Sequence, residues 1–331
     1  MFDCHYDLLT YILMKKNEPD FLKNYCGSVY NDNNITGGIF NLFYMSESEM
    51  KEELGFEKEQ INVIQNLKEV KNYIDSANLF SNKINYIFGI EGLDYLEKID
   101  DIDILYSFGL RSTNPVWNNQ NKFGGGSKTD NKYGLTKLGE LLIKKLVHKN
   151  IAIDLSHTNE STFFDIINLC KNLKKAGENP IVFASHSNVR TLCNVYRNLS
   201  DEQIFAIKEL GGVIGVVSIK KFCVDTNDIC NPDIDFEKYY IEHILYIRNL
   251  LGDVQNISLA TDDMRYYFIE PEYYQNANIY LHFEVREKIE KALLRNGFSI
   301  NEIECIMHKN FESKILNRLN KLLFYYLIKN V

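Results

Sequence analysis

The sequence predicts an α/β fold, a (β/α)8 barrel of the TIM type with loop insertions. Eight short apolar runs rich in β-forming residues recur along the chain, and most precede an amphipathic helical stretch. Alternating strands and helices favour a parallel sheet, and eight strands close into a barrel. A length of 331 residues suits one such barrel. The predicted strands are Met1–Tyr6, Gly38–Met45, Ile84–Ile90, Ile102–Phe108, Ile151–Ser156, Ile181–Ser185, Gly212–Ile219 and Ile257–Thr261.

Two of the helical stretches carry clear start and stop signals. Residues 158–177 end at a glycine that follows two lysines, and their apolar side chains share one helical face. The next helix opens with a capping box, Ser200 followed by Gln203, and also ends at glycine. Each helix comes after a predicted strand, as a (β/α) repeat requires.

The alternative fold is a doubly wound open sheet. That fold usually has a glycine fingerprint after its first strand, and the sequence has none there. Gly124–Gly126 lacks the spacing of a phosphate-binding loop and is expected to be a flexible loop, and Cys223–Phe236 an irregular insertion. No Pro-, Gly- or Ser-rich linker divides the chain. Residues 1–331 are therefore expected to form one domain, with C-terminal helices from about residue 284 packed on the barrel.

Composition excludes several classes of partner. The net charge of −8 argues against nucleic acid or an anionic membrane, since both attract basic surfaces. The longest apolar run, Gly211–Ile219, is too short to span a bilayer, and the first residues lack the features of a signal peptide. The seven cysteines are scattered without a C-x-x-C pair, which suggests free thiols. We expect a cytoplasmic protein.

Ionisable residues gather at the ends of the predicted strands. In a (β/α) barrel the active site lies at the C-terminal ends of the strands, so these side chains should face one rim. His5 and Asp7 are two residues apart, which places them on the same side of a strand. The set comprises His5, Asp7, Glu91, His157, His186 and either Asp262 or Asp263.

A metal site is the favoured interpretation of this set. A single histidine is more often an ordinary hydrogen-bonded group, but burying so many ionisable groups together is costly unless they bind a metal or each other. Imidazole and carboxylate without thiolate suit zinc, and less well Mn, Fe or Co. His5 and Asp7 could hold one ion, and His157 and His186 a second, with Glu91 between them. A water shared by two ions would be a nucleophile near neutral pH, and Asp262 would transfer protons.

Other polar residues have structural interpretations. His148 is at a predicted helix end, His243 lies within a helix and His282 in a tyrosine-rich segment, so none is expected to be catalytic. Ser156 and Ser185, which precede His157 and His186, are expected to be packing or turn residues rather than nucleophiles.

The motifs that carry these residues resemble the renal or membrane dipeptidase family. They are "DCHYD", "GIEG", "YGLTKLGE", "IDLSHTN", "FASHSNVRTLCNVYRNLSDE", "ATDDM" and, near the end, "GFSINEIECIMHKNF". They occur in order over most of the chain. The resemblance implies a (β/α) barrel of the metal-dependent hydrolase type and a dinuclear zinc dipeptidase that uses a metal-bridging hydroxide.

The resemblance also implies a role for each site residue. His5 and Asp7 would bind one zinc, His157 and His186 the other, and Glu91 would bridge them, with Asp262 as the acid and base. Arg197, which alone would suggest only a solvated charge, would bind the C-terminal carboxylate of a dipeptide. A D-residue at the C-terminal position of the substrate and a homodimer are further expectations from the family.

Three positions differ from the family pattern. Trp117 stands where the mammalian enzymes have a substrate-contacting histidine, so Asn118 or the metals would have to stabilise the oxyanion. The eighth strand ends in two adjacent acids, of which Asp262 is the preferred catalytic residue and Asp263 the alternative. His308 replaces a usual glycine and is expected to be structural.

Two other functions fit the same residues. The chain could be another amide- or ester-hydrolysing metalloenzyme, such as a deaminase or lactonase, because a barrel does not determine its substrate. It could also be a non-catalytic metal-binding homologue in which Trp117 fills the substrate space. Arg197 separates the first alternative from a dipeptidase, and hydrolysis of a dipeptide panel separates the second.

Overall fold

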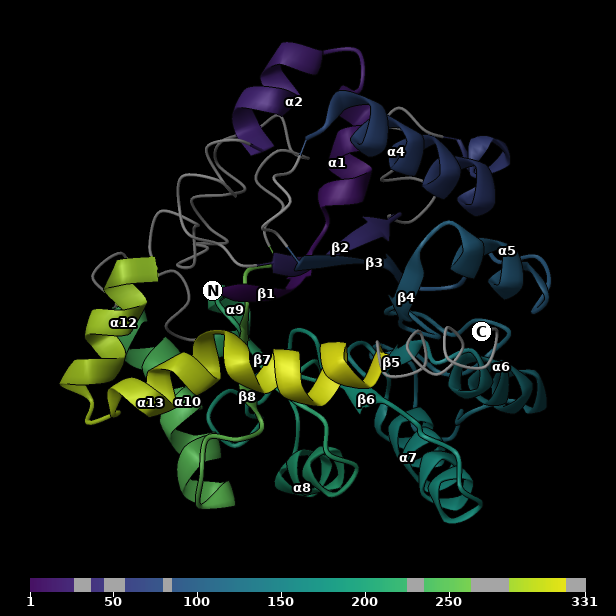
Figure 1. Cartoon of the computed structure of the whole chain (residues 1–331). Coiled ribbons are helices and arrows are strands. Elements are labelled where there is room, and N and C mark those ends of the chain that lie inside the picture. The colour runs from purple at the N-terminus through teal and green to yellow at the C-terminus, as the bar shows by residue number, and fades with distance from the viewer. Residues whose placement is uncertain (27–36, 45–56, 80–84, 225–234, 263–285, 320–331) are drawn as a thin grey trace, which may run out of the picture.

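A parallel sheet of eight strands forms the centre of the protein (Figure 1). The computed structural model describes residues 1–26, 37–44, 57–79, 85–224, 235–262 and 286–319. The strand order is β6-β5-β4-β3-β2-β1-β8-β7, and every pairing is parallel. The strands are β1 (Phe2–Tyr6), β2 (Gly37–Phe43), β3 (Asn85–Glu91), β4 (Leu110–Thr113), β5 (Ala152–Asp154), β6 (Val182–Phe183), β7 (Ile214–Val217) and β8 (Ile257–Ala260).

Backbone contacts between the outermost strands close the sheet. A parallel bridge joins Ala184, just after β6, to Ile214 of β7. The amide of Ala184 donates to the carbonyl of Val213 at 3.0 Å, and the amide of Gly215 donates back to Ala184 at 2.8 Å. These bonds confirm the predicted (β/α)8 barrel, because an open doubly wound sheet would leave both of these strands as free edges.

Helices surround the barrel, with α1 and α4 on one side and α7 and α8 on the opposite side in Figure 1. The predicted capping box at Ser200 and Gln203 is present at the start of α8, and Asn159 caps α7. No helix within the described ranges is both long and apolar enough to cross a bilayer. The α-helices are α1 (Leu8–Lys15), α2 (Pro19–Cys26), α4 (Val63–Ala77), α5 (Asp101–Ser107), α6 (Lys137–His148), α7 (Glu160–Lys175), α8 (Asp201–Glu209), α9 (Lys220–Cys223), α10 (Phe236–Leu251), α12 (Arg286–Arg295) and α13 (Ile300–Glu304). A 3-10 turn, η3 (Lys58–Gln60), and two π-helical segments, η5 (Cys305–Lys309) and η6 (Glu312–Leu316), complete the set.

The predicted strand Ile102–Phe108 is wrong, because these residues form helix α5 and the fourth strand follows it as β4. Asp101 and Asp103 lie in the first turn, where carboxylates favour the positive end of the helix dipole. The buried side chains, Ile102 and Leu105, are three apart. That spacing is typical of a helix, whereas a half-buried strand would alternate every second residue. The other predicted strands overlap the observed ones.

The glycine run Gly124–Gly126 is a loop, as predicted, but it is buried and bonded rather than flexible. The amide of Gly125 donates to the Thr162 hydroxyl at 2.9 Å, and its carbonyl accepts the amide of Asn159 at 3.1 Å. A Cβ atom at Gly126 would lie 1.9 Å from the carbonyl oxygen of Trp117. Glycine is therefore needed for this close approach, which holds the Trp117 loop against the N-terminus of α7. Most of the predicted insertion Cys223–Phe236 lies outside the described residues.

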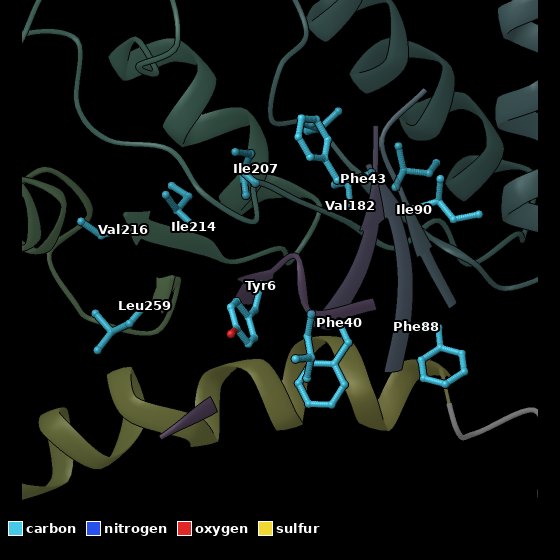
Figure 2. Packing of buried hydrophobic residues seen from close by; sticks show 14 of the residues in the cluster. Tyr6, Phe40, Phe43, Phe88, Ile90, Val182, Ile207, Ile214, Val216 and Leu259 are labelled. Carbon is cyan, nitrogen blue, oxygen red and sulfur yellow. The ribbon is translucent and has the colours of Figure 1, made fainter. Parts of the chain in front are cut away.

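Strand side chains alternate between the barrel interior and the layer beneath the helices. Ile39, Ala152 and Phe183 belong to the interior cluster, whereas their neighbours Phe40, Ile153 and Val182 pack in the outer layer. Figure 2 shows outer-layer side chains on several strands, among them Phe40, Val182 and Leu259, and the C-terminal helix passing below the sheet. Two apolar layers on one set of strands follow from the period of two in a β-strand.

The floor of the barrel is closed by an aromatic cluster. The ring of Phe311 stacks on Phe2 of β1 with 4.2 Å between centroids, and it meets Phe183 edge-on at 5.9 Å. All three side chains are fully buried. The neighbouring Asn310 amide donates to the carbonyls of Val254 and Ile257 at 2.7 and 2.8 Å. These contacts attach the C-terminal helix to the base of the barrel, on the side opposite the strand ends that carry the ionisable residues.

Phe311→Ala should lower the free energy of unfolding by about 3–5 kcal/mol, because it leaves a cavity between two other rings. Urea denaturation would measure the change. Leu141→Ala is the matched control, since Leu141 is 56% exposed and should change stability by less than about 0.5 kcal/mol. Equal stability of the Phe311 variant and the wild type would show that this ring does not support the floor.

His243 is a structural histidine, as predicted. It is fully buried in α10, and its Nδ1 accepts the amide of Val189 at 3.1 Å while Nε2 donates to the carbonyl of Cys223 at 3.1 Å. Nδ1 can accept only when the ring is neutral. Burial lowers the pKa of His243 to about 4, and the Cys223 carbonyl opposes this only in part.

The folded state should therefore lose stability as the pH falls from about 6.5 to about 4, because the unfolded chain takes up a proton on His243 that the folded chain does not. The contribution is about 3 kcal/mol over this window. His243→Gln should remove that part of the slope in denaturation curves taken between pH 7 and 4.5. His148→Gln, at the exposed end of α6, should keep the wild-type slope. A His243 variant with the wild-type slope would contradict the assignment.

Candidate metal centre

Six ionisable side chains meet at the C-terminal mouth of the barrel. His5 lies on β1 with Asp7 just after it, and Glu91 is the last residue of β3. His157 and His186 follow β5 and β6, and Asp262 follows β8. All six are buried, with 0 to 8% of their surface exposed. The structure thus brings together the residues predicted from the strand ends, except the alternative Asp263, which lies outside the described residues. His282, which was not expected to be catalytic, lies outside them as well.

One group of ligand atoms surrounds Nε2 of His5. This nitrogen lies 3.5 Å from Oδ1 of Asp7, 3.4 Å from Oε2 of Glu91 and 3.9 Å from Oδ1 of Asp262. It has no hydrogen-bond partner among the described residues although it is fully buried. A buried ring nitrogen facing carboxylate oxygens is what a cation site requires.

A second group surrounds the other oxygen of Glu91. Oε1 lies 2.8 Å from Nε2 of His157 and 3.3 Å from Nε2 of His186. The two ring nitrogens are 2.9 Å apart. The two oxygens of Glu91 therefore face different groups, which is the arrangement of a carboxylate that bridges two ions.

Hydrogen bonds at the far side of the rings determine which nitrogen carries the proton. Nδ1 of His157 donates to Oδ1 of Asn118 at 2.9 Å, and the same oxygen accepts the Ser127 hydroxyl at 2.8 Å. A neutral ring protonated at Nδ1 has its lone pair on Nε2, directed at Glu91. His186 is bonded at Nδ1 as well, to Ser185 at 2.6 Å. Two lone pairs and a carboxylate converging at these distances repel one another unless a cation lies between them, so the donor set fits a divalent metal.

The pKa values of the second group also favour metal binding. Burial and then the charge of Arg197 lower the pKa of His157 to about 3. Burial and the charge of His5 lower the pKa of His186 well below its usual value. Burial alone would raise the pKa of Glu91, but the charges of His5 and His157 outweigh it and lower that pKa. Neutral imidazoles and an ionised carboxylate are the forms that bind metal at neutral pH.

The first group contains more carboxylates than the second. Burial opposes a charged His5, but the carboxylates of Glu91 and Asp7 outweigh burial and raise its pKa. Burial and the charge of Glu91 raise the pKa of Asp7 to about 7. Burial also raises the pKa of Asp262, with Glu91 adding to it and His5 opposing it. These carboxylates crowd together around one imidazole, so a cation would relieve their mutual repulsion.

Two residues of the centre have strained backbones. His157 and Asp262 adopt left-handed conformations with φ of 69° and 48°. The other non-glycine residues with positive φ in the described part of the chain are asparagines, which tolerate this region better. A left-handed histidine or aspartate persists only where surrounding bonds hold it, and such residues are concentrated at functional sites.

Arg197 is buried beside the centre. Its side chain is 6% exposed and its Nη2 donates to the carbonyl of His186 at 3.2 Å. Its guanidinium lies over the ring of Phe222 at 5.5 Å. Nε has no partner, and no carboxylate lies within 4.0 Å of the group among the described residues. A buried guanidinium whose Nε has no partner in the described part of the chain suits an anionic ligand.

Trp117 and Asn118, predicted to contact substrate, lie differently from each other. The ring of Trp117 is half-buried, 5.6 Å from His157 and 5.2 Å from Phe43 between centroids, and forms a wall of the site. Asn118 instead bonds the back of His157. Since its Oδ1 is already occupied by two donors, its clearest structural role is to hold that ring.

Three residues support the centre although the sequence did not predict this role for them. Asp3 accepts the amide and the hydroxyl of Thr261 at 3.0 and 2.6 Å, which ties β1 to the end of β8. Asp154 and Ser185 bond behind His5 and His186. The sequence "DLSH" could have indicated such support, because its aspartate ends a strand and lies three residues before the ligand histidine.

Comparison with known proteins identifies the family. Residues 1–319 match the model of the membrane dipeptidase family, peptidase family M19. The chain belongs to this family. A solved metallo peptidase from Rhodobacter sphaeroides, bound to a phosphinate mimic of the dipeptide L-Ala-D-Ala, superposes with a TM-score of 0.71 at 20% identity, covering 96% of this chain and 98% of that one.

Curated relatives match over shorter stretches. An uncharacterized protein of Acinetobacter calcoaceticus is 37% identical over 141 residues, 40% of this chain and 42% of the relative. An uncharacterized dipeptidase of Schizosaccharomyces pombe is 28% identical over 185 residues, 55% of this chain and 42% of the relative. The matched part is thus less than half the length of each of these relatives. Family and fold follow from the comparisons, and the chemistry rests on the site.

Proposed function

We propose that the protein is a metal-dependent dipeptidase that holds two divalent ions, zinc in preference to Mn, Fe or Co. The observation that carries the proposal is Glu91, whose two oxygens face separate groups of imidazole and carboxylate atoms. His5 and Asp7 would hold one ion and His157 and His186 the other, with Glu91 shared. Imidazole and carboxylate without thiolate are ligands typical of catalytic zinc.

Bound ions would supply a nucleophilic water of lowered pKa and polarise the carbonyl of the scissile peptide bond. Asp262 would move protons in the reaction, and the 3.9 Å distance from its Oδ1 to Nε2 of His5 at the mouth supports this role. A carboxyl group with a raised pKa can take a proton from the attacking water and deliver it to the leaving amine. Asp263 is the alternative for this role.

Arg197 would select dipeptides by binding their free carboxylate. Its buried guanidinium donates a hydrogen bond to the backbone carbonyl of His186, one of the proposed metal ligands. A carboxylate held there sets a fixed distance to the scissile bond, so a longer peptide would place its carboxylate out of reach. The dipeptide mimic bound by the Rhodobacter protein ends in a D-residue, and a D-residue at this position is part of the proposal.

Trp117 supplies an apolar wall in place of the family histidine. Oxyanion stabilisation would fall to the ions, since Trp117 replaces the histidine and Asn118 bonds the back of the His157 ring. A cytoplasmic location, a homodimer and a single domain over residues 1–331 complete the proposal.

Removing a ligand tests the metal assignment. Zinc-loaded wild type should bind two ions per chain and hydrolyse dipeptides, and His186→Ala should lose one ion and at least about 1,000-fold in kcat/KM, because the ions supply several kcal/mol of transition-state stabilisation. Metal analysis and rates on a panel of L,L and L,D dipeptides measure both. His148→Ala should keep two ions and full activity. Two bound zinc ions with no hydrolysis of any dipeptide would contradict the proposed activity and favour a non-catalytic homologue.

Changing Arg197 tests the substrate class. Arg197→Ala should raise KM for dipeptides by about 100-fold, because it removes charge-assisted hydrogen bonds from a buried site. Arg197→Lys should recover part of the loss. The wild type should hydrolyse dipeptides much faster than dipeptide amides, which lack the free carboxylate. Arg197→Ala should hydrolyse the two kinds of substrate at similar rates. Arg248→Ala, whose guanidinium pairs with Glu302 instead, serves as the control. An unchanged KM would favour a hydrolase for another class of substrate.

A further inference from the structure

The hydroxyl of Ser185 lies between two of the proposed metal ligands. Its Oγ is 3.0 Å from Nδ1 of His5 and 2.6 Å from Nδ1 of His186. The rings of these histidines are 3.9 Å apart between centroids. They belong to different groups of the centre, so one side chain contacts both halves of the site from behind.

Asp154 holds this hydroxyl. Its Oδ2 accepts the Ser185 hydroxyl at 2.5 Å, and its Oδ1 accepts the amides of Ser156 and Ser185 at 3.0 and 2.9 Å. Both serines immediately precede a ligand histidine. The carboxylate is 2% exposed, and Ser185 is 1% exposed. A single buried acid therefore anchors the ends of β5 and β6 together.

Counting donors and acceptors determines the direction of these bonds. A hydroxyl has one proton and two lone pairs, and an ionised carboxylate can only accept. The Ser185 proton must therefore go to Asp154, and both lone pairs remain for the two imidazoles. Each ring must then carry its proton on Nδ1, and its lone pair is on Nε2, which faces the metal centre.

Asn41 does not replace Ser185 in this role. Its Nδ2 lies 3.1 Å from Nδ1 of His5. An amide nitrogen is a donor, and a ring that binds metal through Nε2 needs an acceptor at Nδ1. His157 has its own acceptor, Asn118. Ser185 thus orients His5 and His186, and Asn118 orients His157. Of these two residues, only Ser185 contacts a ring in each group.

We infer that Ser185, fixed by Asp154, is a positioning residue that orients His5 and His186 at once and so couples the two metal subsites. The inference rests on the proposed function. It predicts an asymmetry that ordinary packing would not produce. Loss of the Ser185 hydroxyl should weaken the binding of both ions, whereas loss of the Asn118 acceptor should weaken the binding of only one.

Zinc affinity of the full chain, measured by competition with a chelator, tests the coupling. Ser185→Ala should lower the affinity for both zinc ions by about 10–100-fold, the usual effect of removing a residue that hydrogen-bonds to a metal ligand. Asn118→Ala should weaken one ion by the same factor. Ser258→Ala removes another fully buried hydroxyl, whose partner is Cys4, and should leave both affinities within about 3-fold of wild type.

Asp154→Asn is a second variant of nearly unchanged shape. Its amide oxygen would remain with the two backbone donors, so its NH2 would face Ser185. Of the remaining contacts of this hydroxyl, Nδ1 of His186 at 2.6 Å is much closer than the hydroxyl of Ser156 at 3.4 Å, so its proton should turn to the imidazole and force that ring to protonate on Nε2. At least one zinc ion should be weakened even if Ser185→Ala does not fold.

Nuclear magnetic resonance of zinc-loaded protein labelled with 15N-histidine gives a readout that does not depend on activity. Ser185→Ala should displace the Nδ1–H signals of His5 and His186 and leave that of His157 in place, and Asn118→Ala should do the reverse. Unmoved signals, or wild-type affinity for both ions in Ser185→Ala, would overturn the inference while the proposed metal centre stands. Failure of the wild type to bind two zinc ions would overturn the proposed function itself.

Discussion

The arrangement of the centre depends on one buried carboxylate, Glu91. A lone charge at this depth would be strongly unfavourable, and each oxygen of Glu91 faces imidazole nitrogens from different strands, where a bound cation would compensate the charge. The position of Glu91 at the end of β3 places it between β1 on one side and the loops after β5 and β6 on the other. The barrel must close for those strand ends to meet around it. Fold and site are therefore specified by the same geometry, since an open sheet would separate the imidazoles that surround Glu91.

Much of the fold and of the centre was predictable from the sequence because parallel strands place their C-terminal ends on one rim. His5, Glu91 and His157 could be recognised from that rule alone, without knowledge of any contact. The error at Ile102–Phe108 arose because a short helix with two buried residues resembles a short strand in composition. Periodicity over seven residues is weak, and the acids in its first turn were the better indication.

The supporting residues were not predictable for a different reason. Ser185 bonds Asp154, His5 and His186, which are 31, 180 and one residue away along the chain, and no local pattern encodes such a meeting. Asn118 faces His157 only because Gly126 lets the intervening loop approach the backbone of Trp117. These contacts depend on tertiary packing, so they require coordinates. The left-handed backbone at His157 and Asp262 belongs to the same class, because neighbouring bonds impose it against local preference.

The aromatic floor also bears on how the chain is made. Phe2 lies three residues before His5, yet its stacking partner Phe311 is among the last described residues to be synthesised. During translation, the strand that carries the first ligand must wait for about 300 further residues before its inner face is covered. Contacts between such distant residues form late and slowly. Until then, a nascent chain exposes the apolar underside of its barrel.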